Sequence, residues 1–114
     1  EYTAAGEAES ITAGFTAYGR KGLPAERVAE TACEALLAHH QTPAPVDPHL
    51  ADQLLLPMAL AGGEAGETST IHTSRVTQHL LTNVWVVQQF LDRDIQVTGE
   101  RGAPGMVIVK RKNA

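Results

Sequence analysis

A strongly apolar helical segment near the middle of the chain constrains the fold more than any other feature. Asp47 can cap a helix and Pro48 suits its first turn, so we expect the helix to begin there. No residue from Leu54 to Leu60 has a polar side chain, and such a helix is expected to be buried on all sides, with its polar first turn facing a cleft. We expect Pro57 to kink this helix or to end it early, and residues 61–63 to stop it.

The remaining residue patterns alternate between strands and helices. Val28, Ala32 and Leu36 recur every four residues and indicate the buried stripe of a helix that opens at Pro24. The expected elements are a strand at 9–18, a helix at 24–40, the apolar helix, a strand at 67–73, a helix from about Thr77, and strands at 95–98 and 106–110. This order predicts an α/β sandwich of the α+β kind, with helices packed on one face of a four-stranded mixed sheet.

Length and composition limit the class of protein. With 114 residues and 43% hydrophobic content, we expect one compact domain spanning residues 1–114. A net charge of −4 argues against a free-standing nucleic-acid-binding module. Cys33 is the only cysteine, which excludes an internal disulfide and fits a reduced, cytoplasmic setting. No apolar run approaches the roughly 20 residues that cross a bilayer, and no histidine or carboxylate cluster has metal-ligand spacing.

His79 is the first candidate for chemistry, because it lies in the expected first turn of the helix that follows Thr77. The positive end of the helix dipole favours a neutral imidazole and can hold a phosphate beside it. Thr82 and Asn83 share its helix face, and either side chain could hydrogen-bond the imidazole or a ligand. Such a histidine can be a nucleophile toward phosphorus, although on the pattern alone an ordinary surface histidine is the commoner case.

The run His49–Gln53 is the second candidate. It opens the apolar helix, where backbone N–H groups again offer an anion site. A carboxylate such as Asp52 is favourable in a first turn for purely structural reasons, but the wholly apolar sequence that follows favours a cleft beside it. His39 and His40 lie at the end of the preceding helix and are interpreted as structural.

Two long motifs can now be compared with a known family. They are HLADQLLLPMALAGG at His49–Gly63 and TQHLLTNVWVVQQF at Thr77–Phe90. Both resemble the C-terminal part of RNA 3'-terminal phosphate cyclases, and the earlier unit FTAYGRKGLPAERVA at residues 15–29 is similar to the segment that precedes them. The resemblance implies the last of several repeated units, each with two helices on a four-stranded sheet, within a larger catalytic domain. A start without Met agrees with a piece of a longer protein.

The resemblance also implies an activity. Members of the family use ATP and a divalent metal ion, expected to be Mg²⁺, to convert an RNA 3'-phosphate into a 2',3'-cyclic phosphate. A histidine attacks the α-phosphorus of ATP and becomes adenylated, and the motif match puts this nucleophile at His79. The nucleotide-contacting run of the family falls on His49, Leu50, Ala51, Asp52 and Gln53, although relatives often carry Tyr where this chain has His49. The N-terminal arginines of the family are missing here, so the chain alone is expected to be inactive.

Three interpretations follow from the resemblance. The first is the catalytic C-terminal portion, with RNA 3'-phosphate ends and the remaining N-terminal part of the enzyme as partners. The second is a non-catalytic relative that binds RNA during ribosomal RNA processing, but such relatives lack the nucleophilic histidine that His79 matches. The third, compatible with the first, is an isolated α/β unit that forms homo-oligomers through surfaces otherwise covered by the rest of the enzyme.

Overall fold

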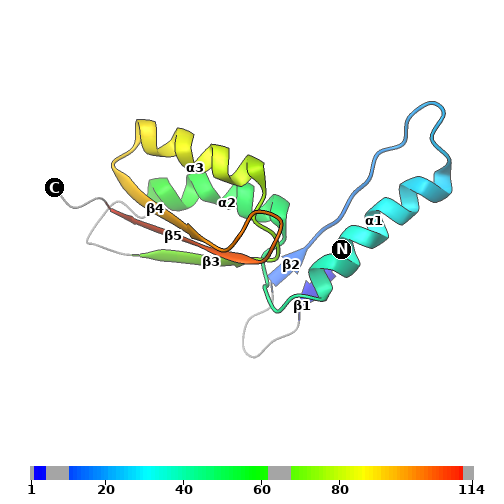
Figure 1. The fold of residues 1–114 in the computed structure, drawn as a ribbon, viewed down its shortest axis with the longest axis horizontal. Helices are drawn as coiled ribbons and strands as arrows, with labels where there is room; N and C mark the ends of the chain where they lie inside the picture. Colours follow the sequence, from blue (N-terminus) through cyan, green and yellow to red (C-terminus); the bar gives the residue numbers. More distant parts are fainter. Residues whose placement is uncertain (1, 5–10, 62–67, 112–114) are drawn as a thin grey trace.

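The computed structural model of the chain describes residues 2–4, 11–61 and 68–111. Figure 1 shows a layer of helices on a small sheet, with one further helix to the side. In chain order the elements are β1 (Tyr2–Ala4), β2 (Ile11–Ala13), α1 (Ala25–His40), α2 (Pro48–Ala61), β3 (Ser69–Thr73), α3 (Gln78–Phe90), β4 (Arg93–Thr98) and β5 (Gly105–Arg111). No helix among the described residues is long and apolar enough to span a membrane.

The main sheet has three strands in the order β3-β5-β4, and both pairings are antiparallel. The expected four-stranded mixed sheet is therefore wrong for the described residues. The strand expected at 9–18 is reduced to Ile11–Ala13, which pairs with β1 in a separate two-stranded sheet. Beside the outer edge of β3, Val46 forms a short bridge to Thr73 instead of a fourth strand. Residues 9 and 10 lie outside the described residues.

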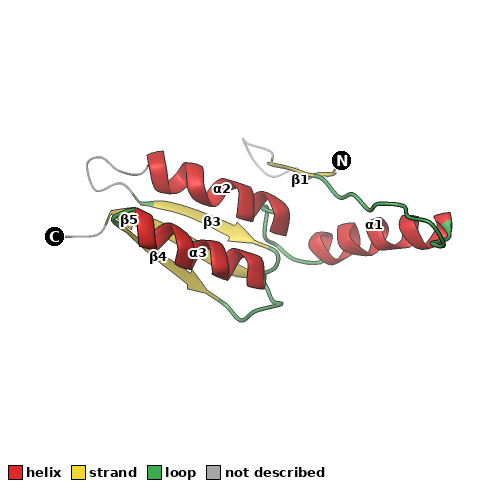
Figure 2. Ribbon diagram, turned by 90° about the horizontal axis from the view of Figure 1, so that it is seen from above, coloured by secondary structure: helices red, strands yellow, loops and turns green. Residues whose placement is uncertain are grey.

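Helices α2 and α3 cover one face of this sheet (Figures 1 and 2). The core between the layers consists of Leu55, Ala59, Leu80, Val84, Ile95, Val107 and Val109. Leu55 and Leu80 are each only 1% exposed, and full burial of one leucine is worth about 1.5–3 kcal/mol. In the chain, β3 follows α2 and precedes α3, and it runs in the direction opposite to both helices. As a result α2 and α3 point the same way and begin at the same end of the sheet (Figure 1).

The apolar helix differs from its prediction in two respects. It begins at Pro48 as expected, and the Leu50 N–H donates to Asp47 Oδ1 at 3.0 Å, but it continues through Pro57 to Ala61 instead of ending early. It is also not buried on all sides, because Leu56 and Leu60 are 50% and 60% exposed. A single helix layer on a single sheet leaves the outer side of each helix open, so apolar side chains there remain uncovered.

The third helix, α1, extends away from the main sheet (Figure 1). The predicted stripe of Val28, Ala32 and Leu36 is confirmed as its half-buried side. At its C-terminal end His39 is 3% exposed, and its Nδ1 lies 2.7 Å from the Ser74 hydroxyl. This contact joins the end of α1 to the connection between β3 and α3.

Candidate functional site

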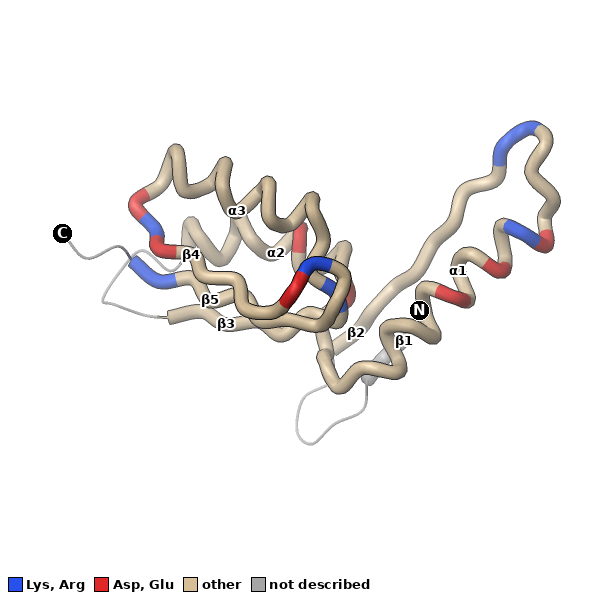
Figure 3. Tube along the Cα trace, viewed as in Figure 1, with Lys and Arg blue, Asp and Glu red and all other residues tan. Residues whose placement is uncertain are grey.

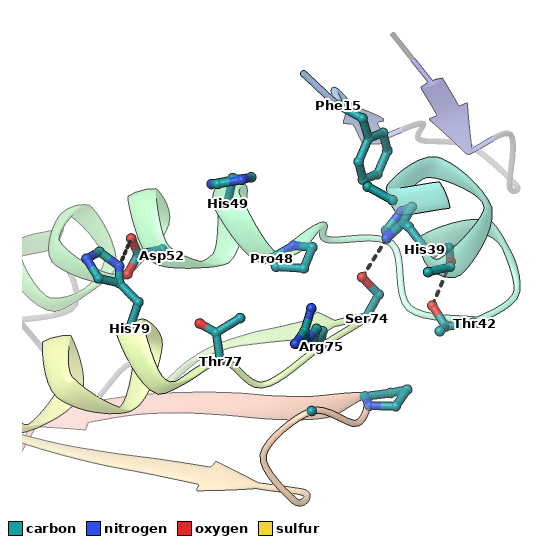
Figure 4. Close-up of a pocket in the computed structure, with 14 residues that line it drawn as sticks. Phe15, His39, Thr42, Pro48, His49, Asp52, Ser74, Arg75, Thr77 and His79 are labelled. Atoms are coloured by element: carbon teal, nitrogen blue, oxygen red, sulfur yellow. Dashed lines mark hydrogen bonds and ion pairs between the residues drawn. The ribbon is translucent and has the colours of Figure 1, made fainter. Parts of the chain in front are cut away.

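A pocket of about 630 Å³ lies where the first turns of α2 and α3 meet the end of α1 (Figure 4). Its volume is within the range of about 300–1,000 Å³ that is usual for small-molecule sites. The lining side chains with polar or ionisable groups are His39, Thr42, His49, Asp52, Ser74, Arg75, Thr77 and His79. The two sequence motifs therefore meet at one pocket.

Local helix chemistry fixes the position of His79. Thr77 is the N-cap of α3, and its side chain accepts a hydrogen bond from the Leu80 N–H at 3.1 Å. Leu80 is buried in the core, which sets the rotation of the first turn. His79 therefore points outward from α3, and its side chain is 74% exposed. The prediction of a first-turn histidine is confirmed.

Asp52 on α2 holds the His79 ring from one side. Its Oδ2 lies 2.6 Å from His79 Nδ1, although the two residues are 27 apart in the chain. The second oxygen, Oδ1, accepts a hydrogen bond from Asn83 Nδ2, one turn further along α3. With both oxygens bonded, the carboxylate is 19% exposed and has a fixed orientation. Figure 4 shows His79 and Asp52 facing each other across the space between the helices.

This geometry determines which nitrogen of His79 is available. An ionised carboxylate can only accept hydrogen bonds, so the nitrogen that faces Asp52 must carry the hydrogen. In the neutral ring the lone pair then resides on Nε2, on the side away from Asp52. An exposed imidazole with a free Nε2, oriented by a carboxylate, is suited to proton transfer or to nucleophilic attack.

The other residues of the run His49–Gln53 are distributed over several surfaces. The His49 side chain is exposed and lines the same pocket as His79. Ala51 is completely buried, so its side chain faces the core. Gln53 is exposed and lines a separate groove on the outer side of α2 and α3. The structure thus brings His49 and Asp52 to His79, but not the side chains of the other three residues.

The structure also places three residues that the sequence interpretation treated as secondary or did not mention. Asn83 was a candidate partner of the imidazole or of a ligand, but it binds Asp52 instead. His39, interpreted as structural, is indeed buried, and its ring centroid lies 5.5 Å from that of Phe15. Arg75, which also lines the pocket, belongs to no motif that could have singled it out. Arg75 lies in the connection between β3 and α3, and only the folded arrangement of these two elements places it at the pocket.

No group of three or more His, Cys, Asp or Glu side chains within the described residues could hold a metal ion. The histidines of the pocket come from three different helices, and among the residues that the structure describes Asp52 is the only carboxylate that lines it. That carboxylate is bonded to His79 and Asn83. In the described site, Asp52 thus lies between His79 and Asn83 and is hydrogen-bonded to both.

Comparison with known proteins agrees with the two motifs. The family model for RNA 3'-terminal phosphate cyclase matches residues 4–97. A protein named RNA 3'-terminal phosphate cyclase from Methylococcus capsulatus is 58% identical over 78 residues, which is 68% of this chain and 20% of that protein. Proteins of the same name from Thermococcus gammatolerans and Pyrococcus furiosus are 43% and 42% identical over 106 residues, covering 93% of this chain and 29% of each relative.

The matched region includes the segment at residues 15–29, both motifs, and every lining residue of the pocket except Gly102 and Pro104. The chain spans only 20–29% of the length of these relatives. Identity of 42–58% is nevertheless far beyond what unrelated sequences share over such lengths. The chain therefore belongs to the RNA 3'-terminal phosphate cyclase family.

Proposed function

We propose that His79 is the nucleophile of an ATP-dependent cyclisation, which converts an RNA 3'-terminal phosphate into a 2',3'-cyclic phosphodiester. In the first step Nε2 attacks the α-phosphorus of ATP, a nitrogen–phosphorus bond forms, and pyrophosphate leaves. In the second step an oxygen of the RNA 3'-phosphate takes the AMP group and His79 is released. The neighbouring 2'-hydroxyl then closes the ring and AMP leaves. Covalent catalysis of this kind divides one difficult displacement into easier ones.

The observation that carries this proposal is the contact between His79 Nδ1 and Asp52 Oδ2, at 2.6 Å. It gives Asp52 a role as a positioning residue, because the carboxylate selects the ring form in which Nε2 is the nucleophile. Asn83 supports Asp52 through the other oxygen. Both helices that carry these residues have buried anchors in the core, Leu55 and Leu80, so the pair is held by rigid elements.

The proposal includes two cofactors, ATP, which is consumed, and a divalent cation, expected to be Mg²⁺. His49 is exposed and lines the pocket, so its side chain is available to contact the nucleotide. For Leu50 and Ala51, contact with the nucleotide would go through the backbone of the first turns of α2. Gln53 would contact the nucleotide from the groove on the outer side of α2 and α3. The cation would be carried to the pocket by the triphosphate, as is usual for Mg²⁺ with few protein ligands.

The proposed partners are RNA 3'-phosphate ends and the remaining N-terminal part of the enzyme. The outer side of α2 and α3 supports the second of these, since it exposes several large apolar side chains. They are Leu56, Leu60, Trp85, Val86 and Phe90. Figure 3 marks few charged residues along these two helices. We propose that this outer apolar face is covered in the complete enzyme, that the chain alone does not turn over, and that the enzyme is cytoplasmic.

The test uses covalent labelling. The chain replaces the matching segment of the Methylococcus capsulatus relative, and the resulting protein is incubated with α-labelled ATP and Mg²⁺. We expect labelled protein that loses its label when an RNA 3'-phosphate is added. His79→Ala should abolish labelling. His72→Ala is the matched control, because His72 is an exposed histidine on β3 that does not line this pocket.

Two results would contradict the proposal. Labelling that persists in the His79→Ala protein would show that another residue is adenylated. A folded protein that binds RNA 3'-phosphate ends, yet is never labelled with His79 intact, would favour the non-catalytic interpretation. Circular dichroism of each variant establishes that the proteins compared are folded.

A further inference from the structure

We propose that Arg75 binds the phosphate group that lies opposite His79 Nε2 in the pocket. The inference rests on the proposed function and adds a residue that neither motif contains. The ligand chemistry is a phosphate dianion, which could belong to the pyrophosphate end of ATP or to the RNA 3'-terminal phosphate. Arg75 and His79 line the same pocket of about 630 Å³.

The backbone at Arg75 is fixed on both sides. Ser74 is 6% exposed, donates its N–H to Val46 O at 2.9 Å, and has its hydroxyl 2.7 Å from His39 Nδ1. Val76 is 1% exposed and donates its N–H to Ala103 O at 2.8 Å. Arg75 is thus held between two buried residues while its own side chain is exposed. Figure 4 shows it between Ser74 and Thr77, on the pocket side of the connection.

The charge of the pocket leaves this guanidinium unneutralised. Arg75 forms no hydrogen bond or ion pair through its side chain within residues 2–4, 11–61 and 68–111. The acidic lining residue is Asp52, and both of its oxygens are bonded to α3 side chains. The chain as a whole carries a net charge of −4. An unpaired guanidinium at a pocket of an acidic protein attracts an anion, and its planar fork matches phosphate oxygens.

The geometry of displacement at phosphorus explains why one cation can serve both steps. The attacking and leaving atoms lie in line with the phosphorus. Pyrophosphate therefore leaves on the side of the phosphorus opposite Nε2, and the RNA 3'-phosphate must later attack from that same side. A guanidinium there would first stabilise the negative charge of the leaving group and then hold the incoming phosphate.

The test measures phosphate binding by the chain itself, without turnover. Isothermal titration and amide chemical-shift titration are done with inorganic pyrophosphate, with uridine 3'-monophosphate, and with uridine. We expect both phosphates to bind in competition, uridine not to bind, and Arg75→Gln to weaken binding about tenfold or more. Arg75→Lys should restore part of the affinity, since it keeps the charge but loses the fork. Arg20→Gln is the control, because Arg20 is exposed and does not line the pocket.

Binding of only one of the two phosphates in an Arg75-dependent manner would support the proposal and assign the group to ATP or to RNA. Equal affinities in the wild-type, Arg75→Gln and Arg20→Gln proteins would overturn it, as would the absence of binding in the wild-type chain. His79→Ala separates the two proposals, since it should keep Arg75-dependent phosphate binding. Phosphate binding without His79 labelling defeats only the proposed function, whereas labelling without Arg75-dependent binding defeats only this inference.

Discussion

The contact between Asp52 and His79 leads to a prediction about which ring nitrogen carries the hydrogen. Removing the carboxylate with Asp52→Ala removes the acceptor that faces Nδ1 at 2.6 Å. A hydrogen bond to a charged group is worth about 1.5–3 kcal/mol, and exposure reduces this. Because the His79 side chain is 74% exposed, we take the lower limit of about 1.5 kcal/mol, which corresponds to about a tenfold change in the tautomer ratio.

The assay is the nitrogen chemical shifts of the His79 ring in ¹⁵N-labelled chain, recorded at a pH where the ring is neutral. In the wild type we expect the form with hydrogen on Nδ1. Asp52→Ala should shift the population toward hydrogen on Nε2, and Asp52→Asn should lie between, because its amide oxygen can still accept. Gln53→Ala is the control, since Gln53 follows Asp52 on the same helix and lines only the outer groove. Identical ring shifts in the wild type and Asp52→Ala would refute the reasoning.

Three further predictions concern stability and association. Gly105→Ala should lower the free energy of unfolding by about 1–3 kcal/mol in denaturant titrations, because its Cβ would collide with Thr98 O and Val76 Cγ2; Gly14→Ala, with nothing within 4 Å, should be close to neutral. His39→Ala should speed amide hydrogen exchange at residues 74–77, because His39 Nδ1 lies 2.7 Å from the Ser74 hydroxyl; exchange equal to that of the wild type would argue against α1 as a support of the pocket. The chain alone should self-associate through the outer apolar face, as measured by light scattering. The double variant Leu60→Ser, Phe90→Ser should shift the chain toward monomer, whereas Tyr18→Ser, at a residue that is 85% exposed, should not.

Local patterns were sufficient for the helices and for the position of His79. The Asp47–Pro48 start follows from side-chain chemistry within a few residues and is confirmed by the hydrogen bond from the Leu50 N–H to Asp47. The helix expected from about Thr77 is also confirmed, and the structure adds that Thr77 is its N-cap. The strand expected at residues 9–18 is confirmed at Ile11–Ala13 and wrong for residues 14–18, because alternation of apolar residues shows only that one side is half-buried. Ala13, Phe15 and Ala17 are indeed less exposed than their neighbours, yet only Ile11–Ala13 has a strand partner.

The apolar helix shows a different limit of sequence interpretation. A run without polar side chains indicates that apolar surface must be covered, but it does not say whether the cover belongs to the same chain. Here the sheet and α3 cover Leu55 and Ala59, whereas Leu56 and Leu60 stay 50% and 60% exposed among the described residues. The expectation of complete burial was thus wrong for the described residues.

The pairing of Asp52 with His79 could not be found from spacing, since 27 residues and a strand separate them. The order of the elements along the chain nevertheless explains why Asp52 and His79 meet. Each connection in α2–β3–α3 reverses the direction of the chain, so the two helices must run parallel and begin at the same end. Two first-turn motifs separated by one returning strand are therefore brought together by topology. In a helix–strand–helix unit of this kind, polar residues near the starts of both helices should be examined as one site.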